Sequence, residues 1–339
     1  NQDILVKMWR LLAVRYTNEP AIGGYDLLNE PIPNWNCPYN SQLLPLYRRL
    51  IRAIREVDPN HVIILEGVHW ATDFSVFEDF TPKEAADNIV LEFHKYWSDP
   101  DEESLAPFVE TAKRLNVPLW MGEGGENNLQ WYTYAFPMYE RLGIGWCFWA
   151  YKKMEVPNSP VTFEKPEGWD QITAYLDGRE RPAPEAAPAI FDRFLNCISH
   201  GEYHPEIIRA LTRRPPLEIP AGAYDAEDIQ SRRSAGAVFR RTSKAALLFA
   251  DGHTGEADWR RYGGEAQPED QKILLCLREG DRVGYRVENL EEKKLRIDVH
   301  SYGDGTLNVQ NMTAQQGLVW VSCSSGIINV ESLHITIEE

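Results

Sequence analysis

Two glutamates of this chain, Glu30 and Glu123, have the sequence context of catalytic carboxyl groups. Each closely follows a short apolar run, which covers residues 21–28 before Glu30 and residues 117–121 before Glu123. Two carboxyl groups on either side of a glycosidic bond can hydrolyse it, because one protonates the leaving oxygen while the other attacks the anomeric carbon. Repulsion between the two favours a proton on one of them, while the nucleophile must stay ionised. The pair therefore predicts glycoside hydrolysis.

Context separates these two glutamates from similar residues nearby. The tripeptide Asn-Glu-Pro at residues 29–31 has a second copy at 18–20, which we interpret as a loop that leads into the strand. Glu126 is the rival for Glu123, but it follows two glycines and is expected in a loop. The alternative for Glu30 itself is a solvated loop residue without a catalytic role.

The elements that position these residues alternate between helix and strand. Apolar residues at helical spacing predict four helices, and five short apolar runs predict buried strands. The predicted helices cover residues 3–16, 43–57, 102–115 and 130–142, and the predicted strands cover residues 21–28, 61–65, 88–93, 117–121 and 145–148. Successive strand ends lie 27 to 37 residues apart, close to the roughly 31 residues per unit of a (β/α)8 barrel.

The position of the polar residues favours a barrel over a doubly wound sheet, whose period is similar. The candidates follow the carboxyl ends of several different strands, as catalytic residues of TIM barrels do. Only five strands are visible, and an incomplete barrel would expose unpaired strand edges. We therefore expect an N-terminal segment of about 90 to 100 residues, in this polypeptide or as a separate piece, to supply the first three strands.

A second domain is expected after the barrel. Helices predicted at 188–197 and 205–211 are followed by a turn at 213–216, so the domains are expected at residues 1–212 and 217–339. Beyond the turn, short apolar runs separated by Gly or Asp predict an all-β sandwich or jelly roll. These runs cover residues 245–249, 273–276, 283–287, 295–299, 318–321 and 333–337.

Residues 1–199 resemble glycoside hydrolase family 5, whose catalytic domain is a (β/α)8 barrel. Tyr25 to Pro31 (YDLLNEP) resembles the motif of the fourth strand, His94-Lys95-Tyr96 that of the sixth, and Met121-Gly122-Glu123 that of the seventh. Trp149 resembles the aromatic platform after the eighth strand. The visible strands would then be the fourth to the eighth.

The resemblance implies a role for each matched residue. Glu30 would be the acid/base, and Asn29 would hold the sugar 2-hydroxyl. His94 would lie near the acid/base, and Tyr96 would hydrogen-bond the nucleophile Glu123. His94 as a core histidine remains an alternative.

Several tryptophans are candidates to stack on sugar rings. Trp149 is one by resemblance, while Trp35, Trp70 and Trp131 follow strand ends or lie in loops expected near the site. Packing in the protein interior remains an alternative for all four.

The region 217–337 resembles, more loosely, family 6 carbohydrate-binding modules. The resemblance rests on residues 219–226, 280–287 and 326–337. Those modules hold a structural calcium ion with two acidic residues; here Gly222 occupies the position of the first, which leaves Glu331 as a lone candidate ligand. Trp259, Tyr262 and Trp320 are candidates for a sugar platform.

Composition and the absence of certain motifs exclude several classes of partner and cofactor. The formal net charge of -16 disfavours nucleic acid as a partner, because phosphate binding depends on Lys and Arg. No apolar run approaches the roughly 20 residues that span a bilayer, so no membrane partner is expected. No phosphate loop, nucleotide fingerprint or metal-ligand spacing is visible, and the five cysteines form no such pattern.

We therefore expect a retaining, cellulase-like or β-glucanase-like hydrolase of a β-linked oligosaccharide or polysaccharide, without a cofactor or metal in its site. The family resemblance implies a secreted or extracytoplasmic protein. The alternative is a non-catalytic carbohydrate-binding protein, or an inactive fragment of such an enzyme.

Overall fold

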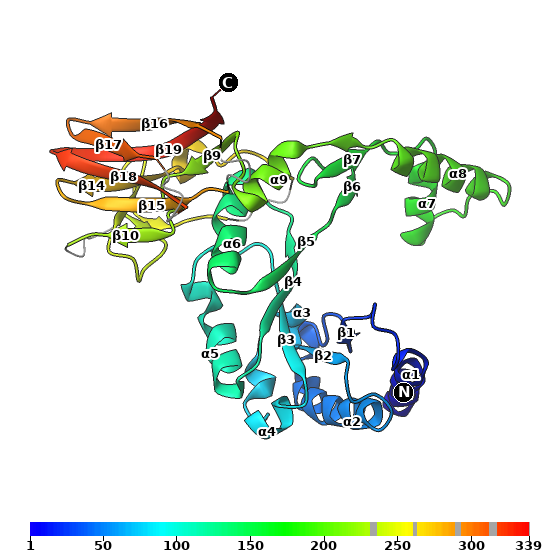
Figure 1. Ribbon diagram of the computed structural model, residues 1–339. Coiled ribbons are helices and arrows are strands. Elements are labelled where there is room, and N and C mark those ends of the chain that lie inside the picture. Colours follow the sequence, from blue (N-terminus) through cyan, green and yellow to red (C-terminus); the bar gives the residue numbers. More distant parts are fainter. Residues whose placement is uncertain (231–235, 260–262, 289–292, 312–316, 339) are drawn as a thin grey trace. The chain divides into compact units, whose positions relative to one another are not determined.

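The chain forms two compact units in a computed structural model that describes residues 1–230, 236–259, 263–288, 293–311 and 317–338 (Figure 1). The first, here called the sheet unit, comprises Asn1–Tyr96, Asp101–Gly124 and Tyr139–Phe148. The second, the sandwich unit, comprises Trp97–Pro100, Gly125–Met138 and Trp149–Glu339. Each is described by itself.

The main sheet has five strands in the order in which they occur along the chain, β1-β2-β3-β4-β5. The pairs β1–β2, β2–β3 and β3–β4 are parallel. A doubly wound sheet reverses its strand order at a switch point, and this sheet has no reversal. The strands are β1 (Gly24–Asp26), β2 (Val62–Glu66), β3 (Ile89–Lys95), β4 (Leu119–Gly125) and β5 (Gly145–Trp149). All five predicted strands are therefore confirmed in place and order.

Helices connect these strands, as the apolar periodicity predicts. On α2, the buried residues Leu43, Tyr47, Leu50 and Ile54 recur every three or four positions, which places them on one face. The helices are α1 (Gln2–Tyr16), η1 (Asn34–Gln42), α2 (Leu43–Arg55), α3 (Val68–Ala71), η2 (Ser75–Phe77), α4 (Pro82–Ala85), η3 (Glu103–Leu105), α5 (Ala106–Leu115) and α6 (Leu129–Arg141).

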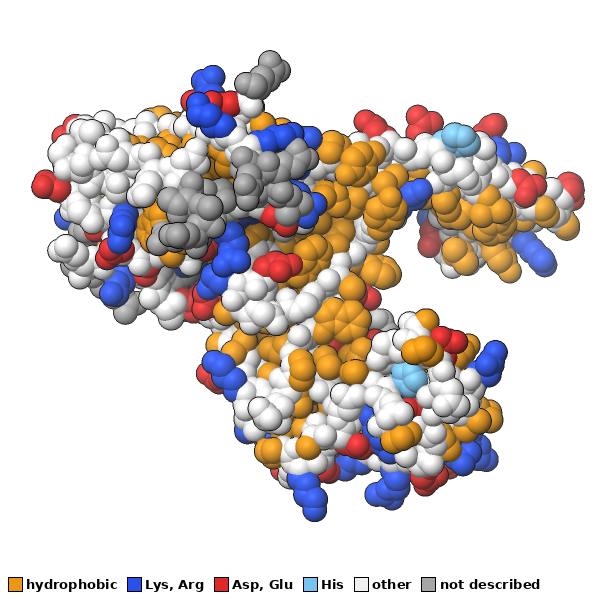
Figure 2. All heavy atoms as spheres, in the orientation of Figure 1, with side chains coloured by type: hydrophobic (Ala, Val, Ile, Leu, Met, Phe, Trp, Pro, Cys, Tyr) orange, Lys and Arg blue, Asp and Glu red, His pale blue; other side chains and the backbone are white. Residues whose placement is uncertain are grey.

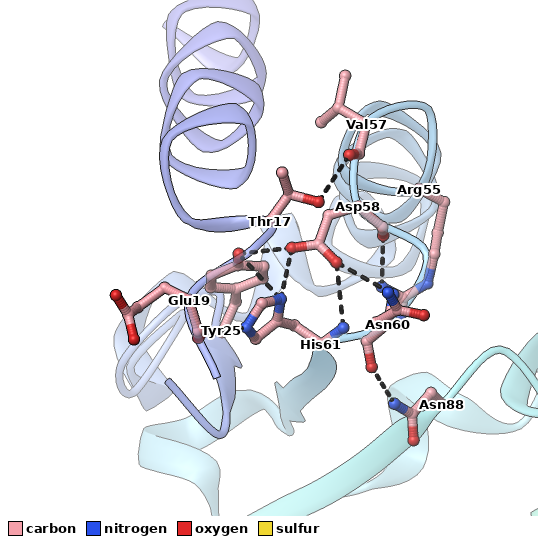
Figure 3. Close-up of polar contacts among 9 residues, drawn as sticks. All are labelled: Thr17, Glu19, Tyr25, Arg55, Val57, Asp58, Asn60, His61 and Asn88. Carbon is pink, nitrogen blue, oxygen red and sulfur yellow. Dashed lines mark hydrogen bonds and ion pairs between the residues drawn. The ribbon is translucent and has the colours of Figure 1, made fainter. Parts of the chain in front are cut away.

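A buried aspartate ties β1 to the turn that precedes β2 (Figure 3). Asp58 Oδ2 accepts a hydrogen bond from the Tyr25 hydroxyl at 2.7 Å and lies 2.6 Å from His61 Nδ1. Its other oxygen accepts the backbone N–H groups of Asn60 and His61. Burial alone would raise the pKa of Asp58, but these hydrogen bonds outweigh it and lower the pKa to about 2.

The sandwich unit contains two antiparallel sheets. One has the order β12-β14-β19-β16, with β9 also paired to β19, and the other has the order β10-β15-β18-β17. The six predicted runs correspond to β12, β14, β15, β16, β18 and β19, whereas no apolar run predicts β9, β10 or β17. The strands are β9 (Leu217–Pro220), β10 (Ala226–Asp228), β12 (Ala246–Phe249), β14 (Ile273–Arg278), β15 (Arg282–Arg286), β16 (Leu295–Gly303), β17 (Thr306–Gln310), β18 (Leu318–Ser325) and β19 (Ile327–Ile337), with β11 (Ala237–Val238) and β13 (Gly255–Glu256) forming a separate pair.

The same unit includes the stretch between β5 and β9. It contains a small sheet of β6 (Lys152–Met154), β7 (Val161–Phe163) and β8 (Glu202–Tyr203), with helices α7 (Trp169–Leu176), α8 (Ala186–Ser199) and α9 (Pro205–Thr212). The predicted helices at 188–197 and 205–211 are confirmed. Hydrophobic side chains gather on the surface of α7 and α8 (Figure 2), where Leu176 and Leu195 are largely exposed.

The compact units divide the chain differently from the predicted domains 1–212 and 217–339, which stay a prediction. Residues 149–216 group with the sandwich, and Arg213 shows one reason. Its buried guanidinium ion-pairs with Asp225 and donates to the backbone carbonyl groups of Thr133 and Ala223. Because a buried guanidinium needs such partners, Arg213 joins α6 and α9 to the start of the sandwich.

No helix among the described residues combines the length and the apolar character needed to cross a bilayer.

Candidate active site

The two predicted catalytic carboxyl groups meet beside one histidine. His94 Nδ1 lies 2.8 Å from Glu30 Oε1 and 3.6 Å from Glu123 Oε2. One ligand atom from each of the three residues lies within 4.8 Å of the other two. Glu30 follows β1, His94 is in β3 and Glu123 is in β4, so three strands of the parallel sheet position them. Both glutamates are partly exposed, whereas the His94 side chain is buried.

The pairing of β3 with β4 explains the position of Glu123. His94 is directly opposite Glu123 in the register of these strands, just after a shift between Phe93 and His94. The Tyr96 hydroxyl, two residues further on, donates to Glu123 Oε2 at 2.7 Å. A phenol donor of this kind stabilises an ionised carboxylate. Asn29 is exposed next to Glu30.

The site rests on a buried pair of carboxyl groups that the sequence reasoning missed. Glu66 ends β2, Glu92 is directly opposite it in β3, and both are buried. His94 Nε2 lies 3.5 Å from Glu92 Oε1 and 3.7 Å from Glu66 Oε1. The sequence contained a signal for this pair. Glu66 directly follows one predicted strand, and in the next strand Glu92 precedes His94 by two residues.

Gly122 leaves the space that Glu92 occupies. A Cβ atom at position 122 would lie 1.4 Å from Glu92 Oε1. Any larger residue would therefore displace the Glu92 carboxyl group, which explains why a glycine precedes Glu123.

The charges around His94 favour its protonated form. Burial alone would lower the pKa of His94, but the close Glu92 carboxyl group, the hydrogen bond to Glu30 and the charges of Glu66 and Glu123 raise it to about 9. At neutral pH the ring is an imidazolium, which donates from Nδ1 to Glu30. Burial also raises the pKa of Glu66 well above its ordinary value.

Two groups of side chains have the spacing to hold a cation. They are Glu30, His94 and Glu123, and the buried set of Glu66, Glu92 and His94. The positive charge of the imidazolium can compensate these carboxyl groups. A bound metal ion is therefore not needed to explain why they lie so close together. A site without metal or cofactor stays a prediction.

The aromatic residues predicted to stack on sugar rings differ in their exposure. Trp35 and Trp70 are in contact, with ring centroids 5.0 Å apart at an edge-to-face angle, and both are exposed. The loop of Trp70 is tied to the loop after Glu30 by a hydrogen bond of 2.9 Å from His69 N to Ile32 O. Trp149 is exposed at the end of β5 and belongs to the sandwich unit.

For Trp131 the structure favours the alternative of packing in the protein interior. Its side chain is completely buried and its indole N–H donates to Ser98 O at 2.8 Å. The apolar ring therefore belongs to the core. The rival nucleophile Glu126 has a partner too, because its carboxylate lies 2.7 Å from Lys153 Nζ.

The sandwich residues provide little support for a sugar platform. Trp259 is buried against Tyr134 and Phe239, and the Arg282 guanidinium lies over the ring of Trp320 at 4.8 Å. Tyr262 lies outside the described residues.

The candidate calcium ligand Glu331 has other partners. Its carboxylate accepts from the Tyr302 hydroxyl at 2.6 Å and lies 3.1 Å from Lys272 Nζ. An ammonium group at that distance is unfavourable for a second cation, so the donor set does not fit calcium well.

Comparison with protein families gives a match for the N-terminal part of the chain. Residues 1–155 match the family Cellulase (glycosyl hydrolase family 5). This range includes every residue of the site above. Residues 1–155 are therefore similar to the catalytic domain of that family.

Curated relatives include enzymes with different substrates. The chain is 37% identical over 95 residues to a beta-xylosidase of Phanerodontia chrysosporium, an alignment that covers 28% of this chain and 19% of that protein. It is 31% identical over 173 residues to an endoglycoceramidase of Hydra vulgaris, with 44% and 32% covered. Endoglucanase C of Acetivibrio thermocellus is 21% identical over 212 residues, with 45% and 61% covered. The chain thus spans a third or less of the first two relatives.

Solved structures with some likeness include two endoglucanases. Cel5A of Pseudomonas stutzeri has a TM-score of 0.38 and 24% identity, with 44% of this chain and 53% of that chain covered. Cel5A of the hyperthermophile Thermotoga maritima has a TM-score of 0.38 and 20% identity, with 44% and 59% covered. These low scores add nothing to the family match.

Proposed function

We propose that this chain carries the catalytic carboxyl pair of a retaining β-glycoside hydrolase, with Glu30 as acid/base and Glu123 as nucleophile. The observation that carries the proposal is the approach of the two carboxyl groups, which have oxygens within 4.8 Å of each other. Retaining enzymes hold these groups about 5 to 5.5 Å apart, whereas inverting enzymes need about 6.5 to 9.5 Å to admit a water molecule. The short separation favours direct attack by Glu123.

The neighbours of each carboxyl group suit its role. Tyr96 donates to the oxygen Oε2 of Glu123, which holds the attacking carboxyl group in place. Glu30 protonates the leaving oxygen in the first step and takes a proton from water in the second, when the glycosyl–Glu123 ester is hydrolysed. His94 contacts both carboxyl groups and fixes the distance between them.

The substrate class that we propose is a β-linked oligosaccharide or polysaccharide, as for a cellulase or β-glucanase. The exposed rings of Trp35 and Trp70 present apolar surface that suits the faces of sugar rings, and Asn29 would contact the sugar next to Glu30. Trp149 is proposed as a further stacking residue on its exposure. Secretion is part of the same proposal, in keeping with a polymeric substrate.

We further propose that a segment with three βα units completes the barrel next to β1. The strand β1 is at one end of the sheet order, where its free edge can accept another strand. Helix α1 exposes a row of apolar residues at helical spacing, Ile4, Met8, Leu11 and Val14. A covering helix and strand would remove both features from water.

Isosteric variants of the two glutamates test the catalytic assignment. In the complete protein, Glu123→Gln and Glu30→Gln should each reduce hydrolysis of cello-oligosaccharides by at least about 100-fold, the scale of acid/base and nucleophilic groups. Glu30→Gln should retain more activity on an aryl glycoside whose leaving group needs no proton, and Glu123→Gln should not. Glu126→Gln is the matched control and should stay active. Unchanged turnover in both variants would refute the assignment.

Binding measurements separate this proposal from a protein that only holds sugar. Calorimetric titration with cello-, manno- and xylo-oligosaccharides is run beside an assay for newly formed reducing ends. Binding with turnover supports the hydrolase, whereas binding without turnover in the complete protein indicates a carbohydrate-binding protein or an inactive fragment.

The companion segment is tested on material from its natural source. Intact mass and N-terminal sequencing should reveal about 90 to 100 additional residues before Asn1, or a separate chain of that size that copurifies. A protein that is active with neither would contradict this part of the proposal.

A further inference from the structure

Glu66 holds the backbone of the residue proposed as acid/base. Its oxygen Oε2 accepts the backbone N–H of Glu30 at 2.6 Å, and its side chain is completely buried at the end of β2. Glu30 has a φ angle of 45°, in the left-handed region that non-glycine residues rarely adopt. Such a conformation persists only where surrounding contacts enforce it. The bond to Glu66 is one such contact, so Glu66 determines in part where the Glu30 carboxyl group lies.

The second oxygen of Glu66 faces the histidine that contacts both catalytic carboxyl groups. Glu66 Oε1 lies 3.7 Å from His94 Nε2, and Glu92 Oε1 lies 3.5 Å from the same atom. On the opposite side of the ring, Nδ1 faces Glu30 and Glu123. The ring of His94 therefore separates a buried pair of carboxyl groups from the catalytic pair, and Glu66 contacts the acid/base through two routes.

Three polar atoms on the buried side of the ring lack a hydrogen bond to the residues that the structure describes. Glu66 Oε1, Glu92 Oε2 and His94 Nε2 are all buried there without a hydrogen bond. Burying carboxyl groups in this way costs stability unless a charge compensates them. Glu66 also interacts with Asp26 of β1, and its contacts with Glu30 and His94 connect this buried group to the site. The ionisable groups that face His94 are Asp26, Glu30, Glu66, Glu92 and Glu123.

We propose that Glu66 is a positioning residue for Glu30, acting through the Glu30 backbone N–H and through the ring of His94. The inference rests on the function proposed above for Glu30. Glu66 has no contact with the sugar in this account. Its buried carboxyl group fixes the main chain of the acid/base and lies against the Nε2 side of the His94 ring, so that Nδ1 stays directed at Glu30 Oε1.

Two variants of Glu66 separate these effects. Glu66→Ala removes both contacts and should lower kcat by about 10- to 100-fold with little change in KM, the scale of a lost positioning bond. Glu66→Gln keeps an amide oxygen for the Glu30 N–H, and should recover most of that loss. A side chain that only fills space would also be replaced well by Gln. The recovery of kcat therefore does not prove positioning, and a second readout is needed.

That readout is the titration of His94 itself, which needs no substrate. In protein with ¹³C-labelled histidine, with His94→Gln to assign the signal, the pKa of His94 should fall measurably in Glu66→Gln, because Glu66 ionises in the pH range in which His94 titrates and its charge favours the imidazolium. Asp58→Asn is the matched control, because Asp58 is also buried and accepts two backbone N–H groups. It should lower stability and leave both kcat and the His94 titration unchanged.

The outcomes separate this inference from the proposed function. An unchanged pKa of His94 in Glu66→Gln, or a kcat of Glu66→Ala within about threefold of wild type, overturns the positioning role. If Asp58→Asn reproduces both changes, the effects reflect stability and the inference is likewise overturned. If the unsubstituted complete protein shows no turnover, the hydrolase proposal is overturned. If the pKa of His94 still falls as expected in Glu66→Gln, the coupling of Glu66 to His94 is supported independently.

Discussion

Replacement of Asp58 by Asn should remove a charge that stabilises the folded sheet unit. Asp58 is completely buried, and its pKa lies at about 2 instead of 3.8 because of its hydrogen bonds from Tyr25, His61 and Asn60 (Figure 3). A difference of about 1.8 units corresponds to roughly 2.4 kcal/mol at about 1.36 kcal/mol per unit. Asn has nearly the same shape and keeps an oxygen for the backbone N–H groups. We therefore expect a loss of about 2 kcal/mol in the free energy of unfolding at pH 7.

The pH dependence has a definite sign. Because the pKa of Asp58 is lowered on folding, its stabilisation is present above about pH 4 and is lost as the pH falls toward 2. Urea titrations followed by tryptophan fluorescence, at several pH values between 7 and 3, measure the difference between wild type and Asp58→Asn. That difference should be constant from pH 7 to 5 and shrink below pH 4.

An exposed aspartate provides the control. Asp3 pairs with Arg49 at the surface, and such pairs contribute about 0 to 1 kcal/mol. Asp3→Asn should therefore change the stability by much less. If Asp58→Asn costs no more than Asp3→Asn at pH 7, or if its cost does not depend on pH, the reasoning about the buried network is wrong.

Three further predictions concern the site. Gly122→Ala should lower kcat by at least about tenfold, because the new Cβ occupies the position of the Glu92 carboxyl group; steady-state kinetics beside a melting curve checks this, and normal kcat contradicts it. Tyr96→Phe removes a charge-assisted hydrogen bond to Glu123, which contributes about 1.5 to 3 kcal/mol. The ratio kcat/KM should therefore fall by roughly 10- to 150-fold. A fall below threefold would show that the bond is unimportant. Treatment with EDTA should leave activity and melting temperature unchanged, since two carboxyl groups suffice for the chemistry; a loss that calcium or zinc restores would point to a metal.

Local patterns were sufficient to predict the strands and the ends at which the site lies. The strand before Glu30 and the strand before Glu123 are marked by apolar runs with clear boundaries. Parallel strands present their carboxyl ends at one edge of a sheet. Once these strands pair in parallel, as the alternation of helix and strand predicts, the meeting of Glu30, His94 and Glu123 follows from their positions at the strand ends.

The supporting residues required information that local patterns lack. Glu66 and Glu92 are acidic residues within or at the end of apolar strands, and such residues can equally face solvent. What places them together under His94 is the register between β2 and β3, and register depends on contacts between residues far apart in the sequence. The φ angle of Glu30 is likewise a consequence of its neighbours.

The same limit applies to the aromatic residues. Trp35, Trp70 and Trp131 are all tryptophans near predicted loops, yet only Trp131 is completely buried. Amino-acid type gives the size and polarity of a side chain, whereas its burial depends on which elements pack around it. Trp259, a candidate for the sugar platform, is buried for the same reason.

By itself, the sequence determined the order of the five strands of the main sheet and pointed to the two glutamates proposed as catalytic, because periodicity and strand ends are encoded within short stretches of chain. Only the tertiary structure decided which buried groups face His94, which tryptophans are exposed and how residues 149–216 group with the sandwich. These depend on register and packing between distant segments, which no short stretch of sequence specifies.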